Sequence, residues 1–453
     1  MKKHSQNMLT GPLLPSVIRY TVPIILTSVL QLLFNAADLV VVGRFCGSVS
    51  VAAVGSTTAI TNLLVNFFIG LSVGTGVTVA HGIGSRRQDV VHNTVHTALP
   101  VALLSGLFLT VVGVCFSEIF LKMMGTPDNV LALSAVYMRI YFGGITFTMV
   151  YNFCAAILRA AGDTKSPLLY LTFAGIVNMV LNFIFVTGLH MNVAGVALAT
   201  TIAQGISALL VVAALMRRED ACRLYLKKMR FHKAQLAKML RIGLPAGVQS
   251  ALFSISNVLI QSSVNSFGDI LMSGNAAASN IEGFVYASIN AFHQTSVNFI
   301  GQNAGAGQYD RVKKTLVCCL GCAAMTGLML GGLSWVFGQP LLSLYITDSP
   351  EAIGWGMIRL GIVAVTYLLC GLMDVTTGSL RGLGESFVPM LISVLGVCGI
   401  RIGWILTVFQ IPAFHTPQSL YISYPVSWTV TFLFQLMAFW KLYKKHTRQA
   451  LGS

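Results

Sequence analysis

The chain has 453 residues, of which 55% are hydrophobic and only 9% charged, and its mean hydropathy is +0.76. A soluble domain carries roughly 25% charged residues. These proportions therefore exclude a water-exposed surface over most of the chain and indicate lipid as its main solvent. The net charge of +15 does not indicate a nucleic-acid binder, because the basic residues form short clusters between apolar runs.

Apolar runs long enough to cross a bilayer recur along the whole chain. A membrane helix needs about 20 mostly apolar residues, and twelve runs satisfy this requirement. In chain order they cover residues 15–42, 50–80, 92–117, 129–157, 165–187, 193–216, 238–264, 272–302, 313–337, 352–379, 387–409 and 419–441. The sequence therefore predicts an all-α integral membrane protein with twelve transmembrane helices.

The distribution of lysine and arginine predicts the orientation of these spans. With the N-terminus inside, 24 of the 29 basic residues lie in cytoplasmic segments and two, Arg44 and Lys122, lie in outside loops. Because positive residues concentrate on the cytoplasmic side, we expect both termini in the cytoplasm. The basic segment 217–237 is then a cytoplasmic linker, expected to be a solvated loop near anionic headgroups.

The second half of the chain repeats landmarks of the first half. Pro23 and Pro245 lie 222 positions apart (245 − 23 = 222). The stretch LRAAGDTKSP at 158–167 and the stretch LRGLGESFVP at 380–389 are separated by the same offset (380 − 158 = 222). We expect each stretch to form a tight turn with glycine, followed by a helix that begins near its proline.

This duplication predicts two lobes, residues 1–216 and 238–453, joined by the linker 217–237. Each lobe is a six-helix bundle. Since six is even, both lobes enter and leave the membrane on the same face, and a pseudo-two-fold axis along the membrane normal should relate them. Two similar lobes with a cleft that opens alternately to either side are typical of secondary transporters.

The two repeated prolines lie early in the first span of each lobe. Pro23 and Pro245 each remove a backbone hydrogen bond and bend the helix that contains them. Two interpretations stay open at this point: a fixed kink, or a helix that bends and straightens during transport.

Three of the 14 acidic residues, Asp38, Glu282 and Asp374, fall within predicted spans. A charge at bilayer depth costs about 3 kcal/mol unless it faces a cavity or a partner, so these acids are the main functional candidates. A carboxylate in a cleft can bind Na⁺, a proton or a cationic substrate. The alternative for each acid is a structural ion pair with one of the arginines inside spans, which are Arg139, Arg359 and Arg401.

Polar residues accompany these acids in both lobes. In the first lobe, Asn178 and Asn182 lie four apart on one helix face, and Thr200 lies on the next span. In the second lobe, Asn257 and Gln261 have the same spacing on the seventh span. They are candidate ligands for the ion or the substrate, although membrane Asn and Thr also join helices without any other role.

Motifs of catalysis and of nucleotide or metal binding are absent from the sequence. It contains no P-loop, nucleophile elbow, HExxH or paired CxxC motif. A membrane-embedded enzyme is therefore disfavoured, and no cofactor is expected besides a coupling ion. His92 and His96 lie four apart near the cytoplasmic start of a span, where a wet helix end is favoured over a metal site.

Taken together, the twelve spans, the proline and aspartate of the first span, and the repeated LRAAGDTKSP stretch resemble the MATE multidrug and toxic compound extrusion transporters of prokaryotes. FIGQNAGAGQYDRVKK, at residues 299–314, is similar to a glycine-rich loop of that family. The resemblance covers essentially the whole chain. It implies a monomer in the bacterial inner membrane that exports amphipathic, often cationic compounds in exchange for Na⁺ or H⁺.

The resemblance also implies roles for particular residues. Asp38 matches the first-span aspartate implicated in coupling, and Asn178, Asn182 and Thr200 match the polar cluster beside it. The sequence departs from the family at Asn182, where many members carry aspartate, which leaves Asp38 as the one acid of that cluster.

In the second lobe, Asp374 resembles the acid that other family branches use in the tenth span, and Glu282 resembles a glutamate commonly found in the eighth span. Na⁺, if it is the coupling ion, would therefore bind at Asp38 or Asp374. The alternative function on the same scaffold is a flippase or exporter of a lipid-linked or metabolic substrate, since a fold does not determine a substrate. An anionic lipid-linked sugar would require a cleft rich in Arg and Lys, whereas the spans hold three bases and three acids.

Overall fold

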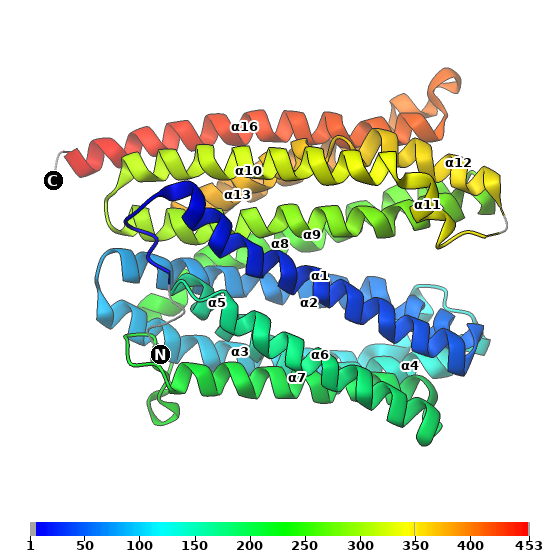
Figure 1. Ribbon diagram of the computed structural model, residues 1–453, viewed down its shortest axis with the longest axis horizontal. Helices are drawn as coiled ribbons and strands as arrows, with labels where there is room; N and C mark the ends of the chain where they lie inside the picture. The colour runs from blue at the N-terminus through cyan, green and yellow to red at the C-terminus, as the bar shows by residue number, and fades with distance from the viewer. Residues whose placement is uncertain (1–5, 348, 452–453) are drawn as a thin grey trace. The chain divides into compact units, whose positions relative to one another are not determined.

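The computed structural model describes residues 6–347 and 349–451, and within them the chain is helical, with sixteen α-helices and no strands (Figure 1). Each of the twelve predicted spans coincides with one helix or with a consecutive series of helices. The predicted all-α fold is therefore confirmed. The helices fall into two compact units, each of which has its own hydrophobic core.

The first unit comprises Leu26–Gly247 with the described residues before Met8. Five spans lie entirely within it. Their helices are α2 (Ser48–Gly84), α3 (Gln88–Met123), α4 (Asp128–Gly143) with α5 (Ile145–Ala160), α6 (Lys165–Phe183) continued by a π-helical turn (Ile184–Gly188), and α7 (Asn192–Met216).

The second unit comprises Met8–Ile25 and the described residues from Val248 onward. It repeats the same order of spans. Its helices are α9 (Asp269–Gly305), α10 (Tyr309–Val336), the short α11 (Gly338–Ser343), α12 (Pro350–Arg359) with α13 (Tyr367–Gly382), α14 (Phe387–Ser393) with α15 (Ile400–Leu406), and α16 (Pro417–Leu451). π-Helical turns follow α12 (Leu360–Ala364) and α14 (Val394–Gly399).

The first helix of each predicted lobe is divided between the two units. α1 (Leu13–Cys46) belongs to the second unit up to Ile25, and α8 (Lys233–Asn265) belongs to the first unit up to Gly247. The units therefore differ from the predicted lobes 1–216 and 238–453 in two segments. Each helix changes unit two residues after its proline, just beyond the turn in which the proline removes a backbone hydrogen bond.

Side-chain packing accounts for the place of the α1 N-terminal segment in the second unit. The Tyr20 ring packs edge-on against Phe299 with centroids 5.3 Å apart, and the hydroxyls of Thr21 and Thr295 are 2.8 Å apart. All four side chains are buried. The chain order alone would assign this segment to the first lobe.

Glycines allow the N-terminal segment of α8 to pack closely against α2 in the first unit. A Cβ atom on Gly70 would lie 2.3 Å from the backbone nitrogen of Gly247, and one on Gly74 would lie 2.1 Å from the carbonyl oxygen of Met239. Both helices carry glycines four residues apart, Gly70 with Gly74 and Gly243 with Gly247. This small-residue spacing lets two membrane helices approach closely.

Left-handed backbone conformations confirm the internal repeat. Gly162 has φ +88° and Gly384 has φ +93°, in the two turns predicted from the sequence. The same correspondence joins Gly47 with Gly268 (268 − 47 = 221) at φ +86° and +95°. Non-glycine residues rarely adopt such angles. The matching angles at these positions therefore indicate that the backbone follows the same path in both halves of the chain.

Hydropathy identifies most of the spans among the described residues. Nine helical segments are long and apolar enough to cross a membrane, and two bent helix pairs bring the number to eleven. α4 meets α5 at 44°, and the α12 segment meets α13 at 42°. The twelfth predicted span is α9, whose 37 residues carry many buried polar side chains and which fails the hydropathy criterion.

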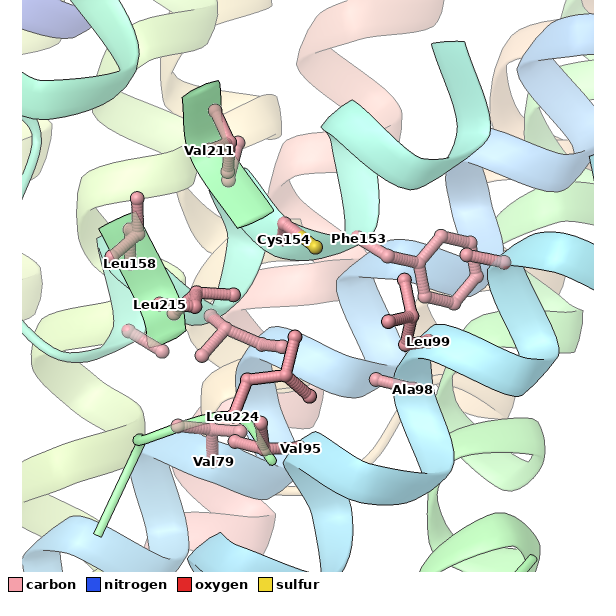
Figure 2. Packing of buried hydrophobic residues seen from close by; sticks show 14 of the residues in the cluster. Val79, Val95, Ala98, Leu99, Phe153, Cys154, Leu158, Val211, Leu215 and Leu224 are labelled. Carbon is pink, nitrogen blue, oxygen red and sulfur yellow. The ribbon is translucent and has the colours of Figure 1, made fainter. Parts of the chain in front are cut away.

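Two residues of the linker after α7, Cys222 and Leu224, are buried in the first unit, whereas most of its other residues are exposed, as expected for a solvated loop. Leu224 enters the core beside Val79 and Val95 (Figure 2), and the Tyr225 N–H donates to His96 Nε2 at 3.0 Å. His96 Nδ1 in turn donates to the carbonyl of His92 at 2.7 Å. His96 is therefore a buried structural residue of the linker contact, unlike the wet helix end predicted for it.

The same core explains the state of the cysteines. Cys154 lies among Phe153, Leu158 and Leu215 (Figure 2), as a small apolar residue would. All nine cysteines of the chain lie in the described part and none is in a disulfide there.

We expect Gly162→Ala to destabilise the protein more than Gly47→Ala. Both substitutions force alanine into a left-handed conformation, which costs about 1 kcal/mol. A Cβ at Gly162 would also lie 2.4 Å from the carbonyl oxygen of Gln6, whereas a Cβ at Gly47 has no atom within 4 Å. Thermal unfolding of the two purified variants, followed by size-exclusion fluorescence, measures the difference, and equal midpoints would contradict the packing argument.

Candidate functional site

The four residues predicted for the first-lobe site lie together in the first unit. Asp38 on α1 accepts a hydrogen bond from Asn182 Nδ2 at 2.5 Å and one from Thr200 Oγ1 at 3.3 Å. With its amide oriented so that both ends find partners, Asn178 donates to Asp38 Oδ1 at 2.9 Å and accepts from the Thr200 N–H at 3.2 Å. The structure thus brings all four side chains into one cluster.

Helix packing explains why these side chains meet. Asn178 and Asn182 are one turn apart on α6, which packs against α7 and so faces Thr200. A Cβ on Gly175 would lie 1.9 Å from the ring of Phe34, so glycine is what allows α1 to approach α6 this closely. Asp38 follows Phe34 by one helical turn and therefore reaches the two asparagines.

The cluster can hold a small cation. Three side chains donate to the carboxylate, while the buried Oδ1 of Asn182 has no hydrogen-bond partner among the described residues. A carboxylate with amide and hydroxyl oxygens beside it offers the hard oxygen ligands that Na⁺ requires. The same carboxylate can accept a proton, so the chemistry of this site suits either coupling ion.

We expect Asn182→Leu to impair transport more than Thr200→Val. Asn182 makes the shorter hydrogen bond to Asp38, and a hydrogen bond to a charged group contributes about 1.5–3 kcal/mol, which corresponds to about a tenfold change or more. The 3.3 Å contact of Thr200 should contribute less, about threefold. Initial rates of dye export from proteoliposomes give both factors, and a larger loss in Thr200→Val would refute this ranking.

In the second unit, Glu282 forms a buried ion pair. Arg359 donates from Nε to Oε1 at 2.9 Å and from Nη2 to Oε2 at 2.7 Å, and both side chains are less than a tenth exposed. Asn275 Oδ1 accepts from Arg359 Nη1 at 2.7 Å. Of the alternatives left open by the sequence, the structure therefore places Glu282 in the interhelical pair with Arg359.

The two amides predicted on the seventh span, Asn257 and Gln261, have different surroundings in the structure. Gln261 joins the ion pair indirectly, because its Oε1 accepts from Asn275 Nδ2 at 3.2 Å. Asn257, one turn earlier on α8, is exposed and lies outside this network. The spacing of four placed them on one face but could not indicate which neighbour that face meets.

Asp374 on α13 has different neighbours from Glu282. Tyr286 and Asn290 of α9 face its carboxylate, and its buried Oδ2 has no hydrogen-bond partner among the described residues. His293 Nδ1 donates to the Asp374 backbone carbonyl at 2.7 Å, and Arg381 lies two turns further along α13. Among the described residues, Asp374 and Glu282 share no hydrogen-bond partner.

Arg381, which the sequence places at the cytoplasmic end of its span, is buried within the protein. Its Nη2 donates to Gln249 Oε1 at 2.8 Å and its Nη1 lies 3.5 Å from His293 Nε2. Two acceptors within the bundle thus replace water around this arginine.

Several polar residues of the second unit were not identified from the sequence. Asn275 precedes Glu282 by seven residues, and Tyr286 and Asn290 follow it by four and eight. All four therefore lie on one face of α9. This periodic polar face is the signal that could have revealed them, because a lipid-facing helix would not carry it.

Comparisons with known proteins agree with this architecture. The MatE family model matches residues 23–184 and 245–405, one segment in each half of the chain. A probable multidrug resistance protein of Bacillus subtilis, YoeA, is 29% identical over 402 residues, which cover 86% of each chain. An FAD transporter of Shewanella oneidensis is 24% identical over 404 residues, which cover 87% of each chain.

The fold is similar to that of solved structures. An outward-facing multidrug resistance MATE family transporter of the MOP superfamily superposes with a TM-score of 0.88 over 96% of this chain and 98% of that chain, at 22% identity. At this level of identity the likeness supports the fold alone.

Proposed function

This chain belongs to the MatE family of membrane transporters, and from that premise we propose that it is an ion-coupled antiporter. In this proposal it exports amphipathic, mainly cationic compounds in exchange for H⁺ or Na⁺. The observation that carries the proposal is the carboxylate of Asp38, surrounded by Asn178, Asn182 and Thr200 within the first unit.

In this proposal the ion and the substrate bind to different acidic residues. Asp38 is the candidate for the coupling ion, and Asp374 is the candidate for the cationic group of a substrate, because its Oδ2 has no partner among the described residues. Na⁺ binding at Asp374 is the alternative assignment. Glu282 is disfavoured for either role, because Arg359 already neutralises it.

Pro23 and Pro245 are proposed as the bending points of this transporter. Each proline precedes by two residues the position at which its helix passes from one compact unit to the other. A helix segment without one backbone hydrogen bond deforms there more easily than elsewhere. Alternating access of the central cleft would use this deformation.

The bacterial inner membrane is the proposed location, with both termini in the cytoplasm, and the protein is proposed to act as a monomer. The 24-to-2 distribution of basic residues supports this orientation. A flippase of anionic lipid-linked sugars, the alternative function, would require many unpaired basic residues. Among the described spans, Arg139 and Arg359 are paired with Glu118 and Glu282, so Arg401 is the one arginine of the three predicted there without an ion pair, which disfavours that alternative.

A metabolite exporter on the same scaffold is the second alternative, and the relative named as an FAD transporter gives it a basis. Dye movement in proteoliposomes that hold the purified protein tests the proposal. Export of ethidium under an imposed Na⁺ or proton gradient is the expected result. Export of FAD without any movement of ethidium, in vesicles shown to be sealed, would favour the metabolite exporter instead.

A further inference from the structure

Arg401 is a buried arginine of the second unit without an acidic partner. Arg401 lies on α15 and is only 4% exposed. Its Nε donates to Ser427 Oγ at 3.0 Å. Among the described residues, no carboxylate pairs with it, and no oxygen accepts from its two terminal amino groups. A buried charge in this state is costly unless something else satisfies it.

The other arginines predicted within spans, Arg139 and Arg359, have acidic partners, and the buried Arg381 of α13 has an acceptor for each of its terminal amino groups. Arg139 contacts Glu118 at 3.2 Å, and Arg359 makes two contacts with Glu282 and one with Asn275. Arg401 therefore leaves the interior of the second unit with a positive charge that the nearby protein groups do not balance. Two free terminal amino groups on a planar guanidinium match the paired oxygens of a carboxylate or a phosphate.

Two aromatic rings contact the guanidinium of Arg401, and two further rings follow them in a row. Its guanidinium carbon lies 4.1 Å from the ring centroid of Tyr424 and 5.6 Å from that of Trp428. Trp428 packs against Tyr367 at 5.1 Å, and Tyr367 lies 6.4 Å from Tyr286. Cation–π contacts orient the guanidinium plane without using its N–H groups.

This row of rings extends from a positively charged residue to a negatively charged one. Arg401 lies at one end, and Asp374, which Tyr286 faces, lies at the other. Rings offer apolar area and stacking surface to an aromatic compound. The arrangement suits an amphiphile that carries an anionic group, and a zwitterion could contact both ends.

We propose that Arg401 binds the carboxylate or phosphate group of an aromatic amphiphile, with Tyr424 and Trp428 beside the ring system of that ligand. That the ligand is also transported rests on the proposed function. Binding by itself does not, so the two ideas can fail separately.

Rhodamine B and its ethyl ester test the proposal, because they share one ring system and differ in a single free carboxylate. Fluorescence anisotropy of each dye with the purified protein in a neutral detergent gives both dissociation constants. Wild type should bind rhodamine B about tenfold more tightly than the ester, as expected for a charge-assisted paired contact. No preference for the acid in wild type would overturn the proposal.

Three variants distinguish a loss of ligand binding at Arg401 from a general folding defect. Arg401→Gln should lose the preference for the acid while it retains affinity for the ester, and Arg401→Lys should retain part of the preference. Arg139→Gln, which also removes an arginine from a span, should leave the preference unchanged. An equal loss of affinity for both dyes in Arg401→Gln and Arg401→Lys would show that Arg401 only supports the structure, and would contradict the proposal.

An anionic lipid headgroup carries the same chemistry as the proposed ligand. The binding measurement is therefore repeated in nanodiscs of zwitterionic lipid and of zwitterionic lipid mixed with phosphatidylglycerol. The same preference for rhodamine B in both supports a dissolved ligand. Loss of the preference with phosphatidylglycerol would assign the site to a headgroup and overturn its assignment to an amphiphile. Since these measurements use no gradient, a failure of ion-coupled export would leave them unaffected.

Discussion

Asp38→Asn is expected to reduce gradient-driven export to the level of vesicles without protein. The amide keeps the size of the side chain and can accept from Asn182 and Thr200, but it neither takes up a proton nor offers a charge to Na⁺. Coupling requires that one group bind and release the ion in each cycle. The measurement is ethidium export in everted membrane vesicles energised by a Na⁺ or a proton gradient.

Two controls make the result specific to coupling. Asp38→Glu keeps the charge and should retain part of the export. Binding of ethidium to purified Asp38→Asn should remain within about twofold of wild type, since Asp374 belongs to the other unit and keeps its neighbours. Export at the wild-type rate in Asp38→Asn would remove Asp38 from the mechanism.

The largest loss of stability is expected from breaking the buried pair of the second unit. Arg359→Met leaves Glu282 in the interior without its two hydrogen bonds, and removal of one partner of a buried pair costs about 3–5 kcal/mol. The double variant Glu282→Gln/Arg359→Met leaves no unpaired charge and should recover most of this loss. Thermal unfolding of the purified variants gives the comparison.

The matched control for the ion pair is Asp374→Asn. It also removes one buried charge from the second unit but leaves the contact between Glu282 and Arg359 intact, so its midpoint should lie near that of wild type. A double variant as unstable as Arg359→Met would contradict the assignment of Glu282 to a structural pair. It would return Glu282 to the candidates for substrate or ion binding.

The spans and the repeat could be predicted because they depend on local properties. Length and hydropathy identify helices such as α3 and α10, and the turns at Gly162 and Gly384 follow from sequence landmarks 222 positions apart. The cluster at Asp38 was also predicted, since Asn178 and Asn182 share a helix face and the resemblance to MATE transporters links them to Asp38.

Partners across helices could not be predicted in the same way. The sequence offered three arginines for Glu282, and only the packing of α12 against α9 selects Arg359. Chain order likewise could not indicate that Met8–Ile25 packs with the second unit or that Leu224 of the linker enters the core of the first. Each of these outcomes depends on which surfaces meet in three dimensions.

Ion movement driven by the substrate tests the central claim most directly. Proteoliposomes that hold the purified protein and a trapped pH- or Na⁺-sensitive dye are given an ethidium gradient and no ion gradient. We expect ethidium to drive the counterflow of one ion in wild type and of neither ion in Asp38→Asn, because exchange couples the two fluxes in both directions. Ethidium movement in wild type without any flux of H⁺ or Na⁺ would contradict antiport through Asp38.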